Sequence, residues 1–206
     1  MKKLIILAVI TVISFQFTAC KSEEKKETPT KTKVKEVAFS LKNATNTIDW
    51  TAYKTTDKVP VKGKFKKVTI TKNGEGNTAK EAINGAEFSI PVSSIFTSDT
   101  SRDFTLRKFF FEAMDTTSLL SGSLHLTDAT NGTASITMNG VTADLPFTYT
   151  IEGKEFKLTA TMHLDNWNTQ KAMESLNGAC KELHKGSDGI SKTWNDVAIN
   201  ITSVFK

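Results

Sequence analysis

Strict alternation of apolar and polar residues over long stretches is the feature that most constrains the fold of this chain. From Val141 to Ile151 every odd-numbered residue is apolar and every even-numbered residue is Thr, Asp or Pro; residues 156–164 alternate in the same way. Because successive side chains of a β-strand point to opposite faces, each run predicts a strand with one dry face and one solvent-exposed face. Such strands are typical of an antiparallel sheet, since parallel sheets are buried on both faces.

Turn signals divide these runs into a meander. Asn139-Gly140 is a dipeptide preferred in two-residue hairpins, and Glu152-Gly153-Lys154 separates the next two runs. Within 61–71 the apolar phase switches, which predicts a β-bulge near Lys66-Lys67. About eight strands are expected, over residues 47–54, 61–71, 85–92, 119–127, 134–138, 141–151, 156–164 and 194–205.

One amphipathic helix accompanies the strands, because apolar residues between Asn168 and His184 follow helical spacing. Cys180 lies on its apolar side and is predicted to be a buried small residue; the alternative is a reactive thiol. A sheet with a single apolar face must close into a barrel or pack as a sandwich, and closure also removes exposed edges. We therefore expect an all-β fold, an antiparallel barrel with one helix.

The N-terminus predicts export and lipid attachment. A basic start and an apolar stretch too short for a comfortable membrane span are typical of a signal peptide, residues 1–19. Small residues then lead into Cys20, which resembles a bacterial lipobox with an acylated cysteine; the alternative is an ordinary secretory peptide. Residues 20–35 are predicted to be a disordered tether and residues 36–206 the folded domain. The expected location is the Gram-negative cell envelope, as a membrane-anchored lipoprotein on its periplasmic or cell-surface face.

The positive charge of the chain lies outside the predicted domain. The sequence has 27 Lys and Arg against 22 Asp and Glu, a formal net charge of +5. Two lysines belong to the signal peptide, and six lysines and three glutamates belong to the tether, which leaves 19 residues of each sign in the domain. A neutral domain lacks the basic surface that nucleic-acid binding requires, so no nucleic acid is expected as a partner.

Inward positions of the strands indicate space inside the barrel. A barrel of about eight strands can hold one small ligand or be filled by its own side chains. Small residues such as Ala52, Gly122 and Ala134 are spread over most strands, and no inward position carries a charge. The alternative is a solid core. The predicted apolar lining of a pocket includes Trp50, Phe65, Phe88, Ile90, Leu124, Ala143, Phe147, Tyr149, Leu158, Ala160 and Met162.

The segment Ser93–Phe111 interrupts the alternation and is predicted to be a short helical lid. Ser101 is expected to cap a turn that starts at Arg102, and Arg102 is expected to pair with Asp103 at the rim. The alternative is that Arg102 and Asp103 fix a loop while the phenylalanines complete the core. The apolar residues expected over the barrel end are Ile95, Leu106, Phe109 and Phe111.

Three stretches, "SSIFT", "SRDFTLRKFFF" and "TMNGVTADLPFTYTI", resemble in this order the YceI family of exported lipid-binding proteins. The resemblance covers about residues 47–205 and implies an extended eight-stranded antiparallel barrel, similar to the lipocalins in plan, that encloses a polyisoprenoid or another long apolar chain. Glu112–Ser118 replaces a Pro-containing strand of the family, and the helix near 168–184 is an addition; both departures bear on ligand identity. The matching positions are Ser94, Ile95, Thr97, Arg102, Asp103, Leu106, Phe109, Phe110, Phe111, Asn139, Gly140, Val141 and Thr142.

The expected function is binding, with sequestration or transport of a long-chain lipid such as a polyisoprenoid or fatty acyl chain in the envelope. Enzyme activity is not expected, because the three histidines have no close sequence spacing and no catalytic motif is present. No cofactor and no metal are expected. The expected partners are the lipid and, through Cys20, a membrane; a homodimer is left open. The alternative is a structural or adhesive envelope lipoprotein with a packed barrel and no ligand.

Overall fold

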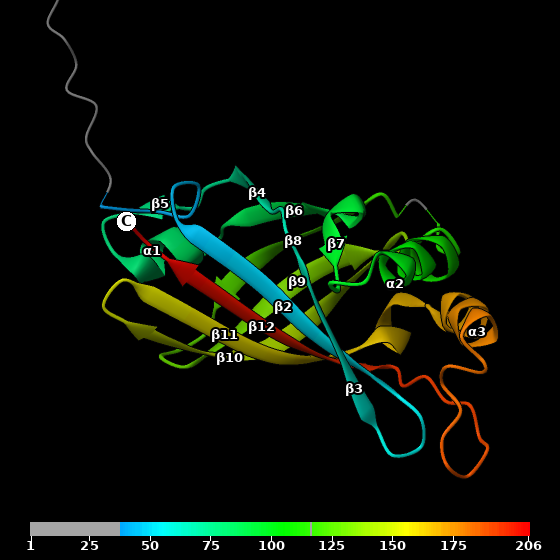
Figure 1. Ribbon diagram of the computed structural model, residues 1–206. Helices are drawn as coiled ribbons and strands as arrows, with labels where there is room; N and C mark the ends of the chain where they lie inside the picture. Colours follow the sequence, from blue (N-terminus) through cyan, green and yellow to red (C-terminus); the bar gives the residue numbers. More distant parts are fainter. Residues whose placement is uncertain (1–37, 116) are drawn as a thin grey trace, which may run out of the picture. The chain divides into compact units, whose positions relative to one another are not determined.

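The computed structural model describes residues 38–115 and 117–206 (Figure 1). The predicted signal peptide, the lipidated Cys20 and the tether lie outside these residues. Within the described chain, three parts position the interior: a curled sheet, a plug at one end of it, and a group of helices at the other end. Among these residues, no helix is long and apolar enough to cross a membrane.

Ten antiparallel strands form one strongly curled sheet, a half-barrel that confirms the expected all-β, lipocalin-like fold (Figure 1). Each predicted strand is present, and the difference in strand number arises at the two edges. The order of neighbours is β4 (Thr69–Lys72), β6 (Glu87–Pro91), β8 (Leu119–Leu126), β9 (Asn131–Met138), β10 (Val141–Glu152), β11 (Glu155–His163), β12 (Asp196–Val204), β2 (Thr45–Lys54), β3 (Val59–Phe65) and β7 (Ile95–Phe96).

The chain crosses between the two edges of the sheet at two places, which explains the additional strands. The bulge predicted near Lys66-Lys67 is instead a break: β3 ends beside the edge strand β7, and β4 forms the opposite edge. Likewise, β6 continues through a short turn, η1 (Val92–Ser94), into β7 on the opposite edge. The two crossings meet, because the backbone N–H of Lys66 donates to the carbonyl of Ser94 at 2.9 Å. The two edges of the half-barrel are thus connected by these two crossing segments rather than by a continuous ladder of paired strands.

The hairpins follow from the turn residues. Asn139 and Gly140 have φ of 54° and 68°, as a type I′ turn requires, and Met138 pairs with Val141 across it. Gly153 has φ of 58° in the turn that pairs Glu152 with Glu155. With both registers fixed at the turns, the apolar residues of β9, β10 and β11 all face the interior.

A plug of small elements and aromatic rings fills one end of the half-barrel. The short helix α1 (Ala79–Ile83) begins at Thr78, whose hydroxyl accepts from the N–H of Glu81, and Ile83 is fully buried. Beside it lies the two-stranded pair of β1 (Phe39–Ser40) and β5 (Glu75–Gly76). The Tyr149 ring lies 5.7 Å from that of Phe156, and its hydroxyl donates to a backbone carbonyl at 2.6 Å. The aromatic residues of this end therefore make a solid core.

Helical segments cover the opposite end (Figure 1). They are α2 (Thr100–Thr105), a π-helical turn η2 (Leu106–Phe111), the 3₁₀ turn η3 (Leu164–Trp167) and α3 (Gln170–Ala179). The helix predicted over residues 168–184 is therefore shorter than expected, and turns follow Cys180. Trp167 is fully buried, and its indole N–H donates to the carbonyl of Ile136 at 2.9 Å, which fixes this end to the sheet.

Gly63 on β3 yields a test of the interior packing. It pairs with Trp50, and a Cβ at Gly63 would overlap the Trp50 ring. We expect Gly63→Ala to lower the free energy of unfolding by about 1–3 kcal/mol, the usual cost of overpacking. The matched control is Gly178→Ala in α3, where a Cβ meets no atom, and it should stabilise the protein by up to about 1 kcal/mol. Urea unfolding of both variants measures the difference, and equal values would contradict this packing.

Candidate ligand cavity

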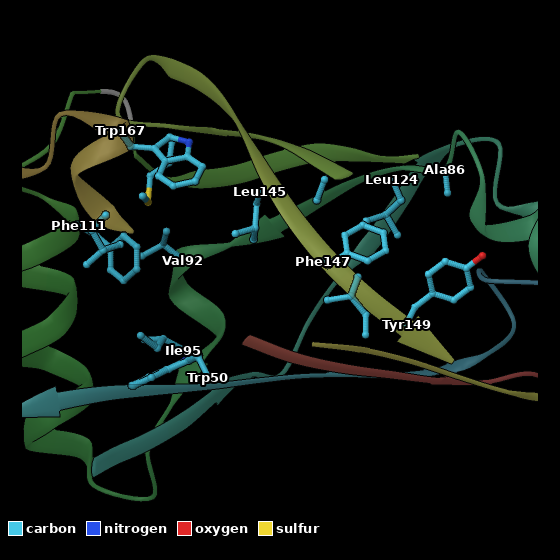
Figure 2. Close-up of a cluster of buried hydrophobic side chains, with 14 of the residues drawn as sticks. Trp50, Ala86, Val92, Ile95, Phe111, Leu124, Leu145, Phe147, Tyr149 and Trp167 are labelled. Atoms are coloured by element: carbon cyan, nitrogen blue, oxygen red, sulfur yellow. The ribbon is translucent and has the colours of Figure 1, made fainter. Parts of the chain in front are cut away.

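An apolar cavity of about 160 Å³ lies inside the curled sheet, between the plug and the helical end. Figure 2 shows two groups of buried side chains that face each other across the interior. Trp50, Ile95 and Phe111 belong to one group and Leu124 to the other, and all four border the cavity. Inward residues such as Phe65 and Ile199 remain partly accessible, because this space adjoins them.

Most of the predicted pocket residues lie on the cavity wall. The structure brings together Trp50, Phe65, Phe88, Ile90, Ile95, Leu106, Phe111, Leu124, Leu158 and Met162. They come from strands across the whole sheet and from the π-helical turn η2, so the wall is assembled from residues that are far apart in the sequence.

Five predicted residues do not reach the cavity. Phe147 and Tyr149 belong to the plug, where their ring centroids lie 6.2 Å apart. Ala143 and Ala160 pack against the hydrophobic core without bordering the free space. Phe109 is partly buried on η2, away from the wall formed by its neighbours. The apolar–polar alternation correctly predicted that these strand residues face inward. It could not predict at which level along the barrel axis side chains fill the interior.

The helical end contributes wall residues that the sequence analysis did not identify as such. They are Phe110 of η2, Met173 and Leu176 of α3, and Thr193 and Trp194, which precede β12. Met173 and Leu176 belong to the stretch 168–184, whose apolar residues follow helical spacing. Periodicity alone does not tell which surface an apolar helix face covers, so their place over the cavity is decided by tertiary packing.

Asp99, rather than Ser101, caps the lid helix α2. The Asp99 side chain accepts from the N–H groups of Ser101 and Arg102, each at 3.0 Å. These bonds, the one from Arg102 first, hold the pKa of the Asp99 carboxyl below its ordinary value. An aspartate at the N-cap satisfies free N–H groups and interacts favourably with the positive helix end. The lid helix therefore begins two residues earlier than the sequence analysis expected.

The second half of the lid turns by π-helical hydrogen bonding. The N–H of Glu112 donates to the carbonyl of Arg107, five residues earlier, at 2.9 Å. In such a turn residues four and five apart share a face, whereas an α-helix brings together residues three and four apart. Leu106 can therefore present its side chain to the cavity together with both Phe110 and Phe111. A regular α-helix would turn Phe111 away from it.

Arg102 and Asp103 do not pair, so the predicted rim ion pair is wrong. The Arg102 guanidinium lies 3.6 Å from the Asp99 carboxylate. Asp103 is buried and accepts from both the backbone N–H and the hydroxyl of Thr97, at 2.8 and 2.7 Å. Consecutive residues of a helix point in different directions, which prevents a mutual contact. Asp103 instead fastens the lid to the segment just after β7, which is the loop-fixing role considered as the alternative.

A polar cluster lies where α3 meets the cavity. The Thr193 hydroxyl donates to Oδ1 of Asn177 at 2.9 Å and lies 2.6 Å from Nδ1 of His184, from which it therefore accepts. Burial, and then the nearby charge of Lys54, lower the pKa of His184, so the ring is neutral at pH 7. Cys180 is buried beside this region as predicted, and burial raises the pKa of its thiol, which disfavours a reactive thiolate.

The wall carries no ionisable side chain. Among the described residues that line the cavity, side-chain nitrogen or oxygen atoms occur only in Trp50, Thr193 and Trp194. In the described ranges, no three His, Cys, Asp or Glu residues could together hold a metal ion. A wall of this kind can act by burying apolar surface.

Comparisons with known proteins agree with this geometry. The family model described as a YceI-like domain matches residues 16–205. A polyisoprenoid binding domain from Saccharophagus degradans implicated in plant cell wall breakdown has a similar structure, with a TM-score of 0.59 and 13% identity over 83% of this chain and 99% of that chain. BcnA of Burkholderia cenocepacia has a TM-score of 0.51 and 19% identity, covering 77% of this chain and 95% of its own. No curated protein sequence matches the chain. At these identities, the structural likeness concerns the fold alone.

The buried histidine predicts a pH dependence of stability. Because the pKa of His184 is lowered in the folded protein, the unfolded chain binds this proton more readily than the folded one. The free energy of unfolding should therefore be at its full value above pH 6.5 and fall as the pH decreases toward 5. Urea unfolding between pH 7.5 and 5 measures this slope. His184→Gln should flatten it and His125→Gln, at an exposed position, should not; the reverse outcome would exclude His184 as the source.

Proposed function

This chain belongs to the YceI-like domain family, and we propose that it binds one long apolar chain, of isoprenoid or fatty-acyl type, inside the curled sheet. The observation that carries the proposal is the cavity wall, which is almost entirely apolar and, among the described residues that line it, lacks ionisable side chains. The polyisoprenoid binding domain of Saccharophagus degradans shares this fold, which supports the ligand class. A cavity of this kind would bind an apolar chain by enclosing it, so the proposal needs no cofactor and no catalytic group.

The free space limits how much of a chain can be enclosed. One water-sized group needs about 10–15 Å³ of such space, so the cavity of about 160 Å³ accommodates on the order of ten methylene-sized groups. Their burial would contribute roughly 8 kcal/mol at about 0.8 kcal/mol each. Immobilising the chain and the protein offsets several kcal/mol of this, which leaves only roughly millimolar affinity for the part of the chain that this cavity encloses. A longer ligand must extend out of the cavity. We expect it to leave at the helical end, because the other end is filled by the plug.

We also propose that the protein acts as an anchored lipoprotein of the cell envelope that carries or shields its lipid there. The support is the lipobox-like run before Cys20 and the charged tether that separates it from the domain. A diacylated and amide-acylated cysteine would hold the protein permanently, since two or more chains anchor firmly. The competing hypothesis, a structural or adhesive lipoprotein without a ligand, requires that the cavity stay empty.

Ligand binding is tested with the delipidated domain and chains of increasing length. Affinity should rise by about fourfold for each added methylene group, the equivalent of 0.8 kcal/mol, until the cavity is full. Ala134→Trp places a ring in the cavity from the middle of β9 and should reduce affinity at least tenfold. Thr161→Trp, on the exposed face of β11, is the matched control and should bind normally. Failure of every isoprenoid and acyl probe to bind would favour the structural hypothesis.

The anchor is tested by Cys20→Ala in cells. The substitution should release the protein from membranes or block its maturation, because acylation requires the thiol. Membrane fractionation and the mass of the mature protein report this directly. An unchanged membrane fraction together with an unchanged mature mass would exclude lipid attachment at Cys20.

A further inference from the structure

The side chain of Asn139 bonds to both parts of the cover over the cavity. Its Nδ2 donates to the carbonyls of Trp167 and Asn168, at 2.8 and 2.9 Å. Its Oδ1 accepts from the backbone N–H of Asp115 at 2.8 Å. The first two acceptors lie between η3 and α3, and Asp115 is the last residue of the lid segment, which we define as residues 99–115. One amide group therefore joins two segments that are far apart in the sequence.

The two parts of the cover have no direct polar connection in the described chain. The turn η2 of the lid segment packs against α3. No hydrogen bond or ion pair between described residues links the lid segment to residues 164–180, except through Asn139. Both parts border the cavity, through Leu106, Phe110 and Phe111 of the lid segment and Met173 and Leu176 of α3.

Polar contacts fasten the lid segment to the rest of the described chain near its two ends. Near its start, Asp103 accepts from the N–H and the hydroxyl of Thr97. At its end, Asp115 donates to Asn139. By contrast, the indole of Trp167 independently fixes η3 to the sheet. Loss of the Asn139 amide would therefore free the end of the lid segment, while η3 would stay in place.

The hairpin itself does not require an asparagine at this position. Asn139 has φ of 54°, which glycine adopts readily, and Gly-Gly also forms type I′ turns. Asn73 has nearly the same backbone, with φ of 53°, and is also followed by a glycine. Its Nδ2 donates to the carbonyl of Gly85 at 2.7 Å, next to β5 of the plug. The two asparagines thus differ in the segments that their side chains hold.

We propose that Asn139 is a positioning residue that fastens the lid segment to η3 and α3, and that the ligand enters and leaves where these two parts of the cover meet. This rests on the proposed function and names the group that controls exchange of the ligand. Entry and exit both need the open cover, so the bonds of Asn139 slow both alike. Asn139 does not line the cavity, so it should leave the affinity unchanged.

The test measures both rate constants of binding by stopped-flow fluorescence on the delipidated full chain. The probes are cis-parinaric acid, an acyl chain, and dansyl-labelled geraniol, an isoprenoid. Asn139→Gly keeps the turn and removes three hydrogen bonds, so the association and dissociation rate constants should both rise by about tenfold. Their ratio, the dissociation constant, should stay nearly the same. Asn73→Gly is the matched control and should exchange both probes at wild-type rates.

A second variant keeps the test decisive if Asn139→Gly loosens the hairpin. Asn139→Asp retains an acceptor for the N–H of Asp115 but loses the donor to the carbonyls of Trp167 and Asn168. Both rate constants should therefore rise in this variant as well.

The outcomes separate this inference from the function on which it rests. If neither probe binds the wild type, the proposed function fails. If the probes bind and both Asn139 variants exchange them at wild-type rates, the role of Asn139 is excluded. A rise of the dissociation rate constant alone would indicate a damaged cavity wall and overturn the inference. An equal rise of both rate constants in Asn73→Gly would also overturn it, because the effect would then be a general loosening of the fold.

Discussion

Covering the apolar face of a single sheet is the constraint on which the rest of this structure depends. In the described chain the one other sheet is the two-stranded pair of β1 and β5 at one end, which is too small to cover the ten strands, so the large sheet curls around its own apolar face. Burial of an apolar face is the dominant favourable term in folding, and curling achieves it without a second layer. The chain crossings at residues 66–68 and 92–94 follow from this shape, because they connect two edges that a flat sheet would keep far apart.

The same constraint explains why the interior is only partly filled. Aromatic rings and α1 pack solidly at one end, and the helical segments cover the other. Between them, small residues such as Ala52 and Ala134 border the free space. Gly122 marks a close approach in this part of the sheet, since a Cβ there would meet Phe88 and Ile136. The cavity thus lies between the two ends of the half-barrel, which are filled or covered by packed side chains.

The lid is held by polar contacts, although its inner face is apolar. Asp99 caps α2, and Asp103 fastens it to Thr97, so that the π-helical turn can direct Leu106 and two phenylalanines inward. Among the described residues that line the cavity, side-chain nitrogen or oxygen atoms occur only in Trp50, Thr193 and Trp194.

Alternation in the sequence determined the antiparallel strands, the hairpin at Asn139-Gly140 and the inward faces, because side-chain direction in a strand depends only on local backbone geometry. Most of the strand residues that it predicted to line a pocket do border the cavity. Tertiary structure alone decided how deep each inward residue lies, which placed Phe147 and Tyr149 in the plug and Leu158 on the wall. It likewise decided the break at Lys66-Lys67, the contact of Asp103 with Thr97 and the covering position of Met173. These features are contacts between segments distant in the chain, and no local pattern encodes the distance between two such segments.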